Sequence, residues 1–496
     1  MQRAVAMVPL VLVPALGVVQ GGFSPDAWVW AGALAAWACV VALVVTANPG
    51  ALRCAWPWAL AAGALLLWTI LSALWSAHAA QSVLEARRTL LYAAVVLALL
   101  VLARSNAQRL LVPATHVAIS VLLLYGLARY LFGARRYDEF EGFLLHQPLG
   151  YANAVGILAT LGLLLAVGLA ASTEARARRA AAAATVPVLA LALVFSQSTA
   201  SMLALGVGLA VVALMTPATL RLLAALGAIV PAAAIAAAVG AYSRFTDDVA
   251  APRISGAVVA AATLGCAALA AVTIGRIRLP VAGTAGRRAR LVVLAAVIVV
   301  ALGGATAVAR SGATEPRASL YHVAWHDEVL AHPFLGTGAG TFGLYWARSG
   351  RALEQGGALD AHSLYLETLA ELGPLGLGLL VAMLLAPLRR ALALRHSPHV
   401  ATAVGAYVAF LVHAGLDWDW EMPAVVVAAL CCAAAVATAE LRPERPLRRA
   451  ARAALLAVGL VLGACAIAGA RSHTGPAAGP ETAKAPRRGA FSQTRA

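Results

Sequence analysis

One polar segment of the chain, 310–373, holds the side chains best suited to chemistry. Arg317 lies near its start, a Gly-x-Gly-x-Gly turn begins at Gly336, and His362 precedes an amphipathic stretch rich in leucine. A guanidinium binds phosphate oxygens bidentately and stays charged at any physiological pH. An imidazole, with a pKa of about 6.5, can accept a proton near neutral pH. The segment therefore offers an anion-binding group and a proton acceptor.

Each of these features also has a plainer interpretation. A lone arginine in a loop is usually a solvated charge, and a lone histidine can cap a helix at the level of the lipid headgroups. The glycines at positions 336, 338 and 340 are no dinucleotide-binding fingerprint, because no strand precedes them. A tight turn is the simpler interpretation, although the backbone N–H groups of such a turn can also face an anion.

The elements that must position these residues are membrane helices. Of the 496 residues, 62% are hydrophobic and only 12% are charged, whereas a soluble domain carries about 25% charged residues. The apolar residues form blocks long enough to cross about 30 Å of hydrocarbon as helices. We therefore predict an all-α polytopic membrane protein with about 12–15 transmembrane helices. The expected spans are 4–20, 28–47, 57–76, 88–103, 110–132, 150–171, 183–198, 199–216, 221–241, 254–275, 291–309, 364–388, 400–415, 422–440 and 453–470.

The stretch 183–216 can be a hairpin of two helices or one long irregular span, and the sequence leaves both interpretations open.

The charges predict how the chain is oriented in the bilayer. The net charge is +16, almost all of it from arginine, and the arginines gather in alternate connections between the apolar blocks. The positive-inside rule explains this pattern better than nucleic-acid binding does, so no nucleic-acid partner is expected. The rule places the segment 310–373 on the outer, extracytoplasmic side. The basic tail, 471–496, departs from the alternation, because it also falls outside in this count.

These patterns divide the chain into four parts. An N-terminal transmembrane bundle is expected over 1–309, and the extracytoplasmic loop with short helices over 310–373. Further transmembrane helices follow over 374–470, and a disordered polar tail over 471–496.

An acidic turn lies between the last apolar blocks. Asp417, Asp419 and Glu421 could suggest a cation site. An acidic outer turn, with Trp418 and Trp420 as anchors at the membrane interface, is the favoured interpretation.

The segment 310–373 also carries an ordered motif. It reads Arg–x(7)–Trp, then Pro-Phe-Leu-Gly-x-Gly-x-Gly-x-Phe, then Ala-His-x-x-Tyr-Leu-Glu-x-x-x-Glu-Leu-Gly, and it resembles the conserved core of the O-antigen ligase/polymerase family. The matching residues are Arg317, Trp325, Pro333, Gly336, Gly338, Gly340, Phe342, Ala361, His362, Tyr365, Leu366, Glu367, Glu371 and Gly373. The stretch from Pro148 to Asn153, and His413 with Asp417, resemble two further family motifs.

Two positions differ from the family pattern. Ser363 stands where an asparagine commonly follows the histidine, and Thr199 stands where an arginine commonly begins a middle span. Arg244 is a candidate to replace that second cation.

The resemblance implies a GT-C-like membrane enzyme that moves a glycan from a polyprenyl (undecaprenyl) pyrophosphate carrier to an acceptor hydroxyl. The acceptor is a glycan, a lipid or a protein, and the reaction takes place on the outer face of the cytoplasmic (inner) membrane. The expected catalytic residues are Arg317, for the pyrophosphate, and His362, for the acceptor proton. The expected substrate-binding residues are Gly336, Gly338, Gly340, Tyr365, Glu367, Arg244 and Asn153.

No metal or other cofactor is expected, because arginines can neutralise the phosphate. Glu367 and Glu371 either hold Arg317 or His362 in place or form an exposed polar face, and the sequence favours neither.

Other functions stay open at this point. A polysaccharide polymerase uses the same donor and differs only in its acceptor. A solute transporter, for instance for bicarbonate, should show ionisable residues or broken helices in the middle of its spans, and the sequence shows neither clearly. A membrane scaffold would leave the loop motif unexplained.

Overall fold

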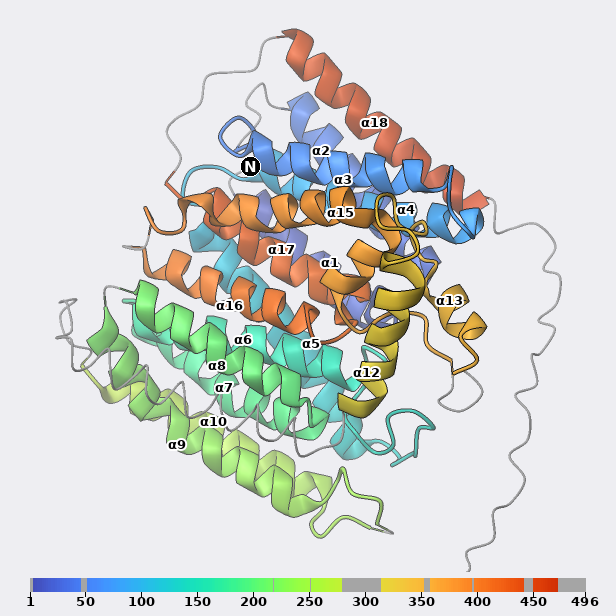
Figure 1. Ribbon diagram of the computed structural model, residues 1–496. Coiled ribbons are helices and arrows are strands. Elements are labelled where there is room, and N and C mark those ends of the chain that lie inside the picture. The colour runs from blue at the N-terminus through green and yellow to red at the C-terminus, as the bar shows by residue number, and fades with distance from the viewer. Residues whose placement is uncertain are drawn as a thin grey trace, which may run out of the picture.

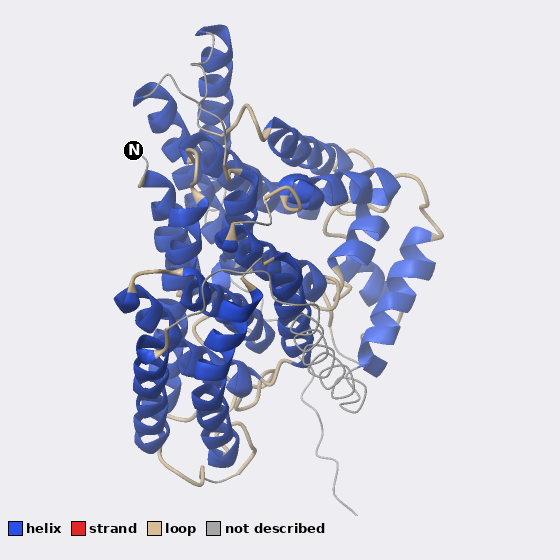
Figure 2. Cartoon of the chain, turned by 90° about the vertical axis from the view of Figure 1, so that its left-hand side faces the viewer, coloured by secondary structure: helices blue, strands red, loops and turns tan. Residues whose placement is uncertain are grey.

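The computed structural model describes residues 3–45, 51–216, 218–249, 251–278, 314–351, 357–394, 397–440 and 449–471. All regular elements in these ranges are helices, and no strand occurs among them (Figure 2). Seven helices are long and apolar enough to cross a membrane, and five further apolar helices are shorter. The prediction of an all-α polytopic membrane protein is therefore confirmed.

The helices follow the apolar blocks closely. Their bounds are η1 Ala4–Ala6, α1 Met7–Gly17, η2 Gln20–Gly22, α2 Pro25–Val45, α3 Trp56–Ser72, α4 Ala79–Leu102, α5 Gln108–Phe132, α6 Ala152–Ser172, α7 Arg176–Ser196, α8 Thr199–Met215, α9 Thr219–Ser243, α10 Gly256–Arg276, α12 Thr314–His322, η3 Val323–Val329, α13 Phe342–Arg348, α15 Leu364–Leu385, η4 Ala386–Arg390, α16 Pro398–Ala414, η5 Asp419–Glu421, α17 Pro423–Ala437 and α18 Arg449–Arg471. The element η3 is a single π-helical stretch.

The stretch that the sequence left open, 183–216, is two helices. Helix α7 ends where Gln197 takes a left-handed conformation, and the side chain of Ser198 then caps α8 by accepting from the N–H of Ser201. A left-handed residue stops the helical hydrogen-bond pattern, so the chain reverses here. The predicted span 291–309 and the end of the tail, 472–496, lie outside the described residues.

The helices α6 and α17 lie at the centre of the bundle. The whole membrane-length window of α6 is buried, and every residue of α17 is buried as well. A helix that is apolar on all sides needs neighbours on all sides, and α6 packs against α5, α7, α8, α9 and α16. Around this centre, α9 and α10 lie on one flank and α18 on the other (Figure 1).

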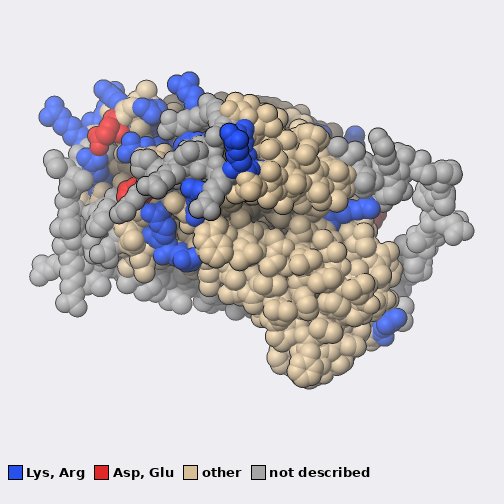
Figure 3. Space-filling model, turned by 90° about the horizontal axis from the view of Figure 1, so that it is seen from above, with Lys and Arg blue, Asp and Glu red and all other residues tan. Residues whose placement is uncertain are grey.

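The outer surface of the bundle suits lipid rather than water. Large apolar side chains on α2, α9 and α10 are exposed, among them Val44, Ile235 and Leu264. Viewed from above, a broad area without charged side chains covers much of the surface (Figure 3). On the face shown in Figure 3, arginine side chains gather mainly toward the end of the bundle that lies away from α12 and α13.

The segment 310–373 folds over one end of the bundle. Its described elements are α12, η3 and α13, which lie together beside the start of α15 (Figure 1). They form a small apolar core of their own around Val323, Phe342 and Trp346, which packs on Ala370 of α15. This end of the bundle carries the candidate site.

Candidate active site

The carboxylate of Asp417 is the centre of a buried polar cluster. Its oxygens accept hydrogen bonds from the hydroxyl of Tyr151 at 2.5 Å and from the amide of Asn153 at 2.6 Å. A guanidinium nitrogen of Arg317 lies 3.1 Å away and forms an ion pair with it. Asp417 itself is fully buried, whereas the Arg317 side chain keeps 18% of its surface exposed. The cluster therefore holds Arg317 in place and leaves part of its guanidinium open.

Three separate elements bring these groups together. Tyr151 and Asn153 lie at the start of α6, Arg317 on α12 and Asp417 in the turn between α16 and η5. The ring of Trp418 stacks on Tyr151 with 4.3 Å between ring centroids and closes one side of the cluster.

His362 lies just before α15, in a left-handed conformation with φ of 52°. Its Nδ1 faces a carboxylate oxygen of Asp360 at 2.8 Å, and its backbone N–H donates to the same oxygen. Burial lowers the pKa of His362, but hydrogen bonding and charge from Asp360, helped by the charge of Asp417, outweigh burial and raise the pKa above its ordinary value. With Nδ1 held toward a carboxylate, Nε2 is the nitrogen that can accept a proton.

Arg317 and His362 belong to the same electrostatic neighbourhood. The charge of Asp417 raises the pKa of His362, and the charge of Arg317 lowers it. The His362 side chain is 24% exposed. The structure thus joins Arg317 and Asn153 directly at Asp417, and His362 feels the charges of this cluster while its own contacts are with Asp360.

A second histidine is buried beneath this cluster. Nδ1 of His413 lies 2.7 Å from Asp419, and its Nε2 lies 2.9 Å from the hydroxyl of Ser201 at the start of α8. The family motif paired His413 with Asp417, but its carboxylate partner is Asp419. The ring of His413 and the carboxylate of Asp419 are both fully buried. Through Ser201, the pair fixes the end of α16 to α8.

The side chains of the acidic turn are buried, which the sequence did not indicate. Asp417 and Asp419 are fully buried, and Glu421 is 8% exposed. The reason is tertiary: Arg317, His413 and Arg88 each supply a partner for one carboxylate, so the turn can be buried without leaving a charge unpaired. Burial raises the pKa of Glu421 to about 7.

The glutamates of α15 hold backbone segments rather than the two catalytic candidates. Glu371 accepts from the N–H of Gly340 at 2.7 Å and of Phe342 at 3.0 Å. Glu367 accepts from the N–H of Ala361 at 2.7 Å, directly before His362. Neither glutamate is an exposed polar residue. Glu367 therefore fixes the chain on which His362 is presented.

The glycine turn is a tight turn with little room. Residues 336, 338 and 340 have φ of 70°, 101° and 73°, which only glycine adopts without strain. A Cβ at Gly336 would strike the backbone of Glu371, and one at Gly338 would strike Ser76. The N–H of Gly338 donates to the carbonyl of Glu371 at 2.8 Å. The backbone N–H groups of the turn thus donate to α15 and hold the turn against this helix.

Two other candidates lie apart from Asp417. The hydroxyl of Tyr365 donates to the carbonyl of Leu411 at 2.7 Å and ties α15 to α16. Arg244 stands at the end of α9, pairs with Asp247 at 2.5 Å and is 42% exposed. The described contacts thus place Arg244 in a local ion pair.

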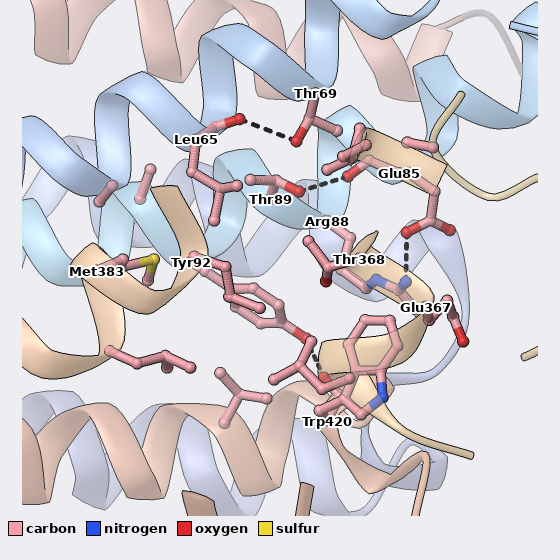
Figure 4. A pocket seen from close by; sticks show the side chains of 18 of the residues that line it. Leu65, Thr69, Glu85, Arg88, Thr89, Tyr92, Glu367, Thr368, Met383 and Trp420 are labelled. Atoms are coloured by element: carbon pink, nitrogen blue, oxygen red, sulfur yellow. Dashed lines mark hydrogen bonds and ion pairs between the residues drawn. The ribbon is translucent and has the colours of Figure 1, made fainter. Parts of the chain in front are cut away.

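A second charged cluster, centred on Arg88, was not singled out from the sequence. Arg88 on α4 is buried, forms ion pairs with Glu85 and with Glu421 (3.0 Å for the latter), and lies over the rings of Trp28 and Trp420 at 5.5 and 4.9 Å from the ring centroids. Figure 4 shows Arg88 and Glu85 beside Glu367 and Trp420 at a cavity of about 110 Å³. The signal available was the pair Glu-x-x-Arg at one end of an apolar span.

Arg88, Glu85 and Glu367 also border a larger, more open cavity of about 470 Å³, which is lined further by Phe23, Trp28 and His78. The two cavities meet at these three charged residues. The loop that carries His362 therefore has the Arg317–Asp417 cluster in its neighbourhood and is fixed, through Glu367, beside the Arg88 cluster.

Among the described residues, no group of three or more histidine, cysteine, aspartate or glutamate side chains is arranged to hold a metal ion. That the reaction proceeds without a metal stays a prediction.

The comparison with known families decides what this arrangement belongs to. The model of the O-antigen ligase family matches residues 184–381, which include Arg317, the glycine turn and His362. This match supports an assignment of the matched domain to the O-antigen ligase family. The matched region runs from α7 to α15 and contains the whole described part of the loop. No curated protein matches the chain. The domain match supports a membrane glycan transferase of the ligase/polymerase kind.

Proposed function

We propose that the protein transfers a glycan from a polyprenyl pyrophosphate to an acceptor hydroxyl, at the extracytoplasmic face of the cytoplasmic membrane. The observation that supports this proposal is that the partly exposed guanidinium of Arg317, paired with Asp417, and the partly exposed ring of His362, paired with Asp360, belong to one electrostatic neighbourhood. The family supports a transfer of this class, and the arginine-rich opposite end of the bundle (Figure 3) supports the orientation.

Each group has a defined part in the transfer. Nε2 of His362 takes the proton of the acceptor hydroxyl as its oxygen attacks the anomeric carbon. The bond between that carbon and the pyrophosphate oxygen breaks, and its electron pair leaves with the pyrophosphate. Arg317 lies where its guanidinium can bind the leaving oxygens, since only some of its five N–H donors are needed for Asp417. Charge stabilisation of this kind is worth most in a site shielded from water.

Two other residues position these groups. The amide of Asn153 donates to Oδ2 of Asp417, the same oxygen that Arg317 contacts, and so helps to fix the direction of Arg317. Glu367 holds the backbone before His362. The division of the chain at 310 and 373 stays part of the proposal, and it is supported by the packing of α12, η3 and α13 into a small core of their own.

The test is transfer by the purified full chain in proteoliposomes. A polyprenyl-pyrophosphate oligosaccharide is supplied with candidate lipid, glycan or protein acceptors, and products are identified by mass spectrometry. Arg317→Ala and His362→Ala should abolish product, whereas Arg348→Ala and His332→Ala, exposed residues of the same segment, should not. Normal product from both site variants would contradict the mechanism.

The same experiment separates ligase from polymerase. Product on a completed lipid or protein anchor indicates a ligase, and a longer carrier-linked glycan indicates a polymerase. Uptake of bicarbonate into the same vesicles without any glycan product would favour the transporter instead.

A further inference from the structure

A lateral groove lies at the end of the bundle opposite the candidate site. It is formed by α5, α6, α7 and α10 and has a volume of about 600 Å³. Helix α6 runs from the candidate site to the groove. Asn153 at its start donates to Asp417, and Thr173, directly after its end, lines the groove. Twenty residues of helix separate these points, which is about 30 Å. The groove opening therefore lies at the other membrane surface.

The walls of the groove are apolar and open to the bilayer. Val117, Val121 and Leu124 line it from α5, and Leu264 lines it from α10. These four side chains are 47%, 55%, 52% and 61% exposed. Apolar side chains exposed on a membrane helix contact hydrocarbon, so an acyl chain can lie in this groove.

One end of the groove is cationic. Arg109, Arg178 and His399 line it there, and His399 lies close enough to Arg109 to feel its charge. Both arginines are exposed, and within the described part of the chain neither forms an ion pair. The nearby acidic residue, Glu174, is already paired with Arg221 at 2.7 Å.

The backbone adds to this positive potential. Helices α5, α7 and α16 begin at Gln108, Arg176 and Pro398, so three helix N-termini lie at the cationic end. Each contributes a partial positive charge. The described residues that line the groove include no acidic side chain.

Polar groups also occur inside the groove. The hydroxyl of Thr185 lies 3.2 Å from Nε2 of His116, and Ser120 has a buried hydroxyl without a hydrogen-bond partner in the described structure. His116 is seven residues along α5 from Arg109, which is about 10 Å. These groups lie deeper in the groove than its arginines and offer hydrogen-bond partners there.

We propose that this groove binds one anionic phospholipid, with its phosphate between Arg109, Arg178 and His399 and an acyl chain along α5 and α10. Charge complementarity selects this occupant, because basic pockets between membrane helices favour anionic headgroups. A zwitterionic lipid fills the apolar part equally well but gains less from the arginines. The site is independent of the glycan-transfer reaction.

Native mass spectrometry of the full chain in detergent tests the proposal. Phosphatidylglycerol and phosphatidylcholine with the same acyl chains are titrated separately. The wild type should retain one phosphatidylglycerol in preference to phosphatidylcholine. The variant Arg109→Gln/Arg178→Gln should lose about 25-fold in affinity for phosphatidylglycerol, since each arginine near an anionic lipid is worth about fivefold, and should bind phosphatidylcholine as before.

Two matched variants sharpen the result. Arg276→Gln removes an exposed arginine at the same end of the bundle but outside the groove, and should leave binding unchanged. Ala184→Phe fills the groove without removing charge and should weaken the binding of both lipids. Thermal melting of each variant checks that it is folded. Equal binding of the two lipids by the wild type, unchanged binding in the double arginine variant, or an equal loss in Arg276→Gln would each overturn the proposal.

Discussion

Two arginines of this fold differ in what surrounds their charge. Arg88 is 4% exposed at its side chain and has two carboxylates and two tryptophan rings around it. Arg317 is 18% exposed and has one carboxylate, Asp417. The surroundings of Arg88 already neutralise it, whereas Arg317 keeps donors for a further anion. We therefore propose a structural role for Arg88 and substrate binding for Arg317.

The largest effect that would sharpen this comparison is expected at His362. His362→Ala should lower the rate of glycan transfer by about 10²–10⁴-fold, because a general base contributes that much. Thermal stability should change little, since the imidazole is partly exposed and paired only with Asp360. Transfer assays and melting curves of the same preparation measure both quantities. A rate within tenfold of the wild type would remove His362 from the mechanism.

The second-largest loss of transfer rate is expected on substitution of Arg317. Arg317→Gln should slow transfer by about 10²–10³-fold, the usual cost of losing one electrostatic contact to a developing charge. Arg317→Lys should recover only part of the rate, because an ammonium cannot bind two oxygens in the same plane. If the lysine variant lost more than the glutamine variant, the binding of phosphate by this residue would be in doubt.

Arg88 should behave differently. Arg88→Met leaves Glu85 and Glu421 without their cation, and breaking a buried ion pair in this way typically costs about 3–5 kcal/mol. The expected result is a lower melting temperature in detergent, with the exposed Arg129→Met as the control. Replacing both glutamates by glutamine in the same chain should recover part of the loss. Full stability of Arg88→Met with abolished transfer would reverse the comparison of the two arginines.

The smallest expected effect is a shift in the pH dependence of the transfer rate. The pKa of His362 is raised in the folded protein, with Asp360 as its principal stabilising partner. Transfer should therefore fall as the pH drops through this raised pKa, because the protonated ring cannot accept the acceptor's proton. Asp360→Asn removes the negative charge, so the acidic limb of the rate profile should move to lower pH. A limb that stays in place, or moves to higher pH, would mean that another group controls it.

The sequence predicted local features well and long-range partners poorly. The helix positions and the tight glycine turn follow from patterns of a few residues. The role of Asp417 does not, because its partners lie 100 and 264 residues away, and only the packing of α6, α12 and α16 brings them together. The burial of the turn at 417–421 was not predicted, because its charges are visible in the sequence while their partners are not.

The Arg88 cluster was missed for the same physical reason. Glu85 and Arg88 are one helical turn apart, and alone they look like an ordinary interfacial pair. The Glu85–Arg88 pair can be buried without a large cost in free energy because Glu421, 333 residues away from Arg88 in the sequence, also pairs with this arginine. A buried charge in an apolar span is thus better detected by asking which distant residue can neutralise it.

A double-mutant cycle on Arg317 and His362 tests the central claim most directly. Initial rates of glycan transfer are compared for the wild type, Arg317→Ala, His362→Ala and the double variant in the same vesicles. Residues that act at one centre are strongly non-additive, so the double variant should be within about tenfold of the slower single variant. A double variant whose loss is the full product of the two single losses would contradict the claim that the two side chains serve one reaction centre.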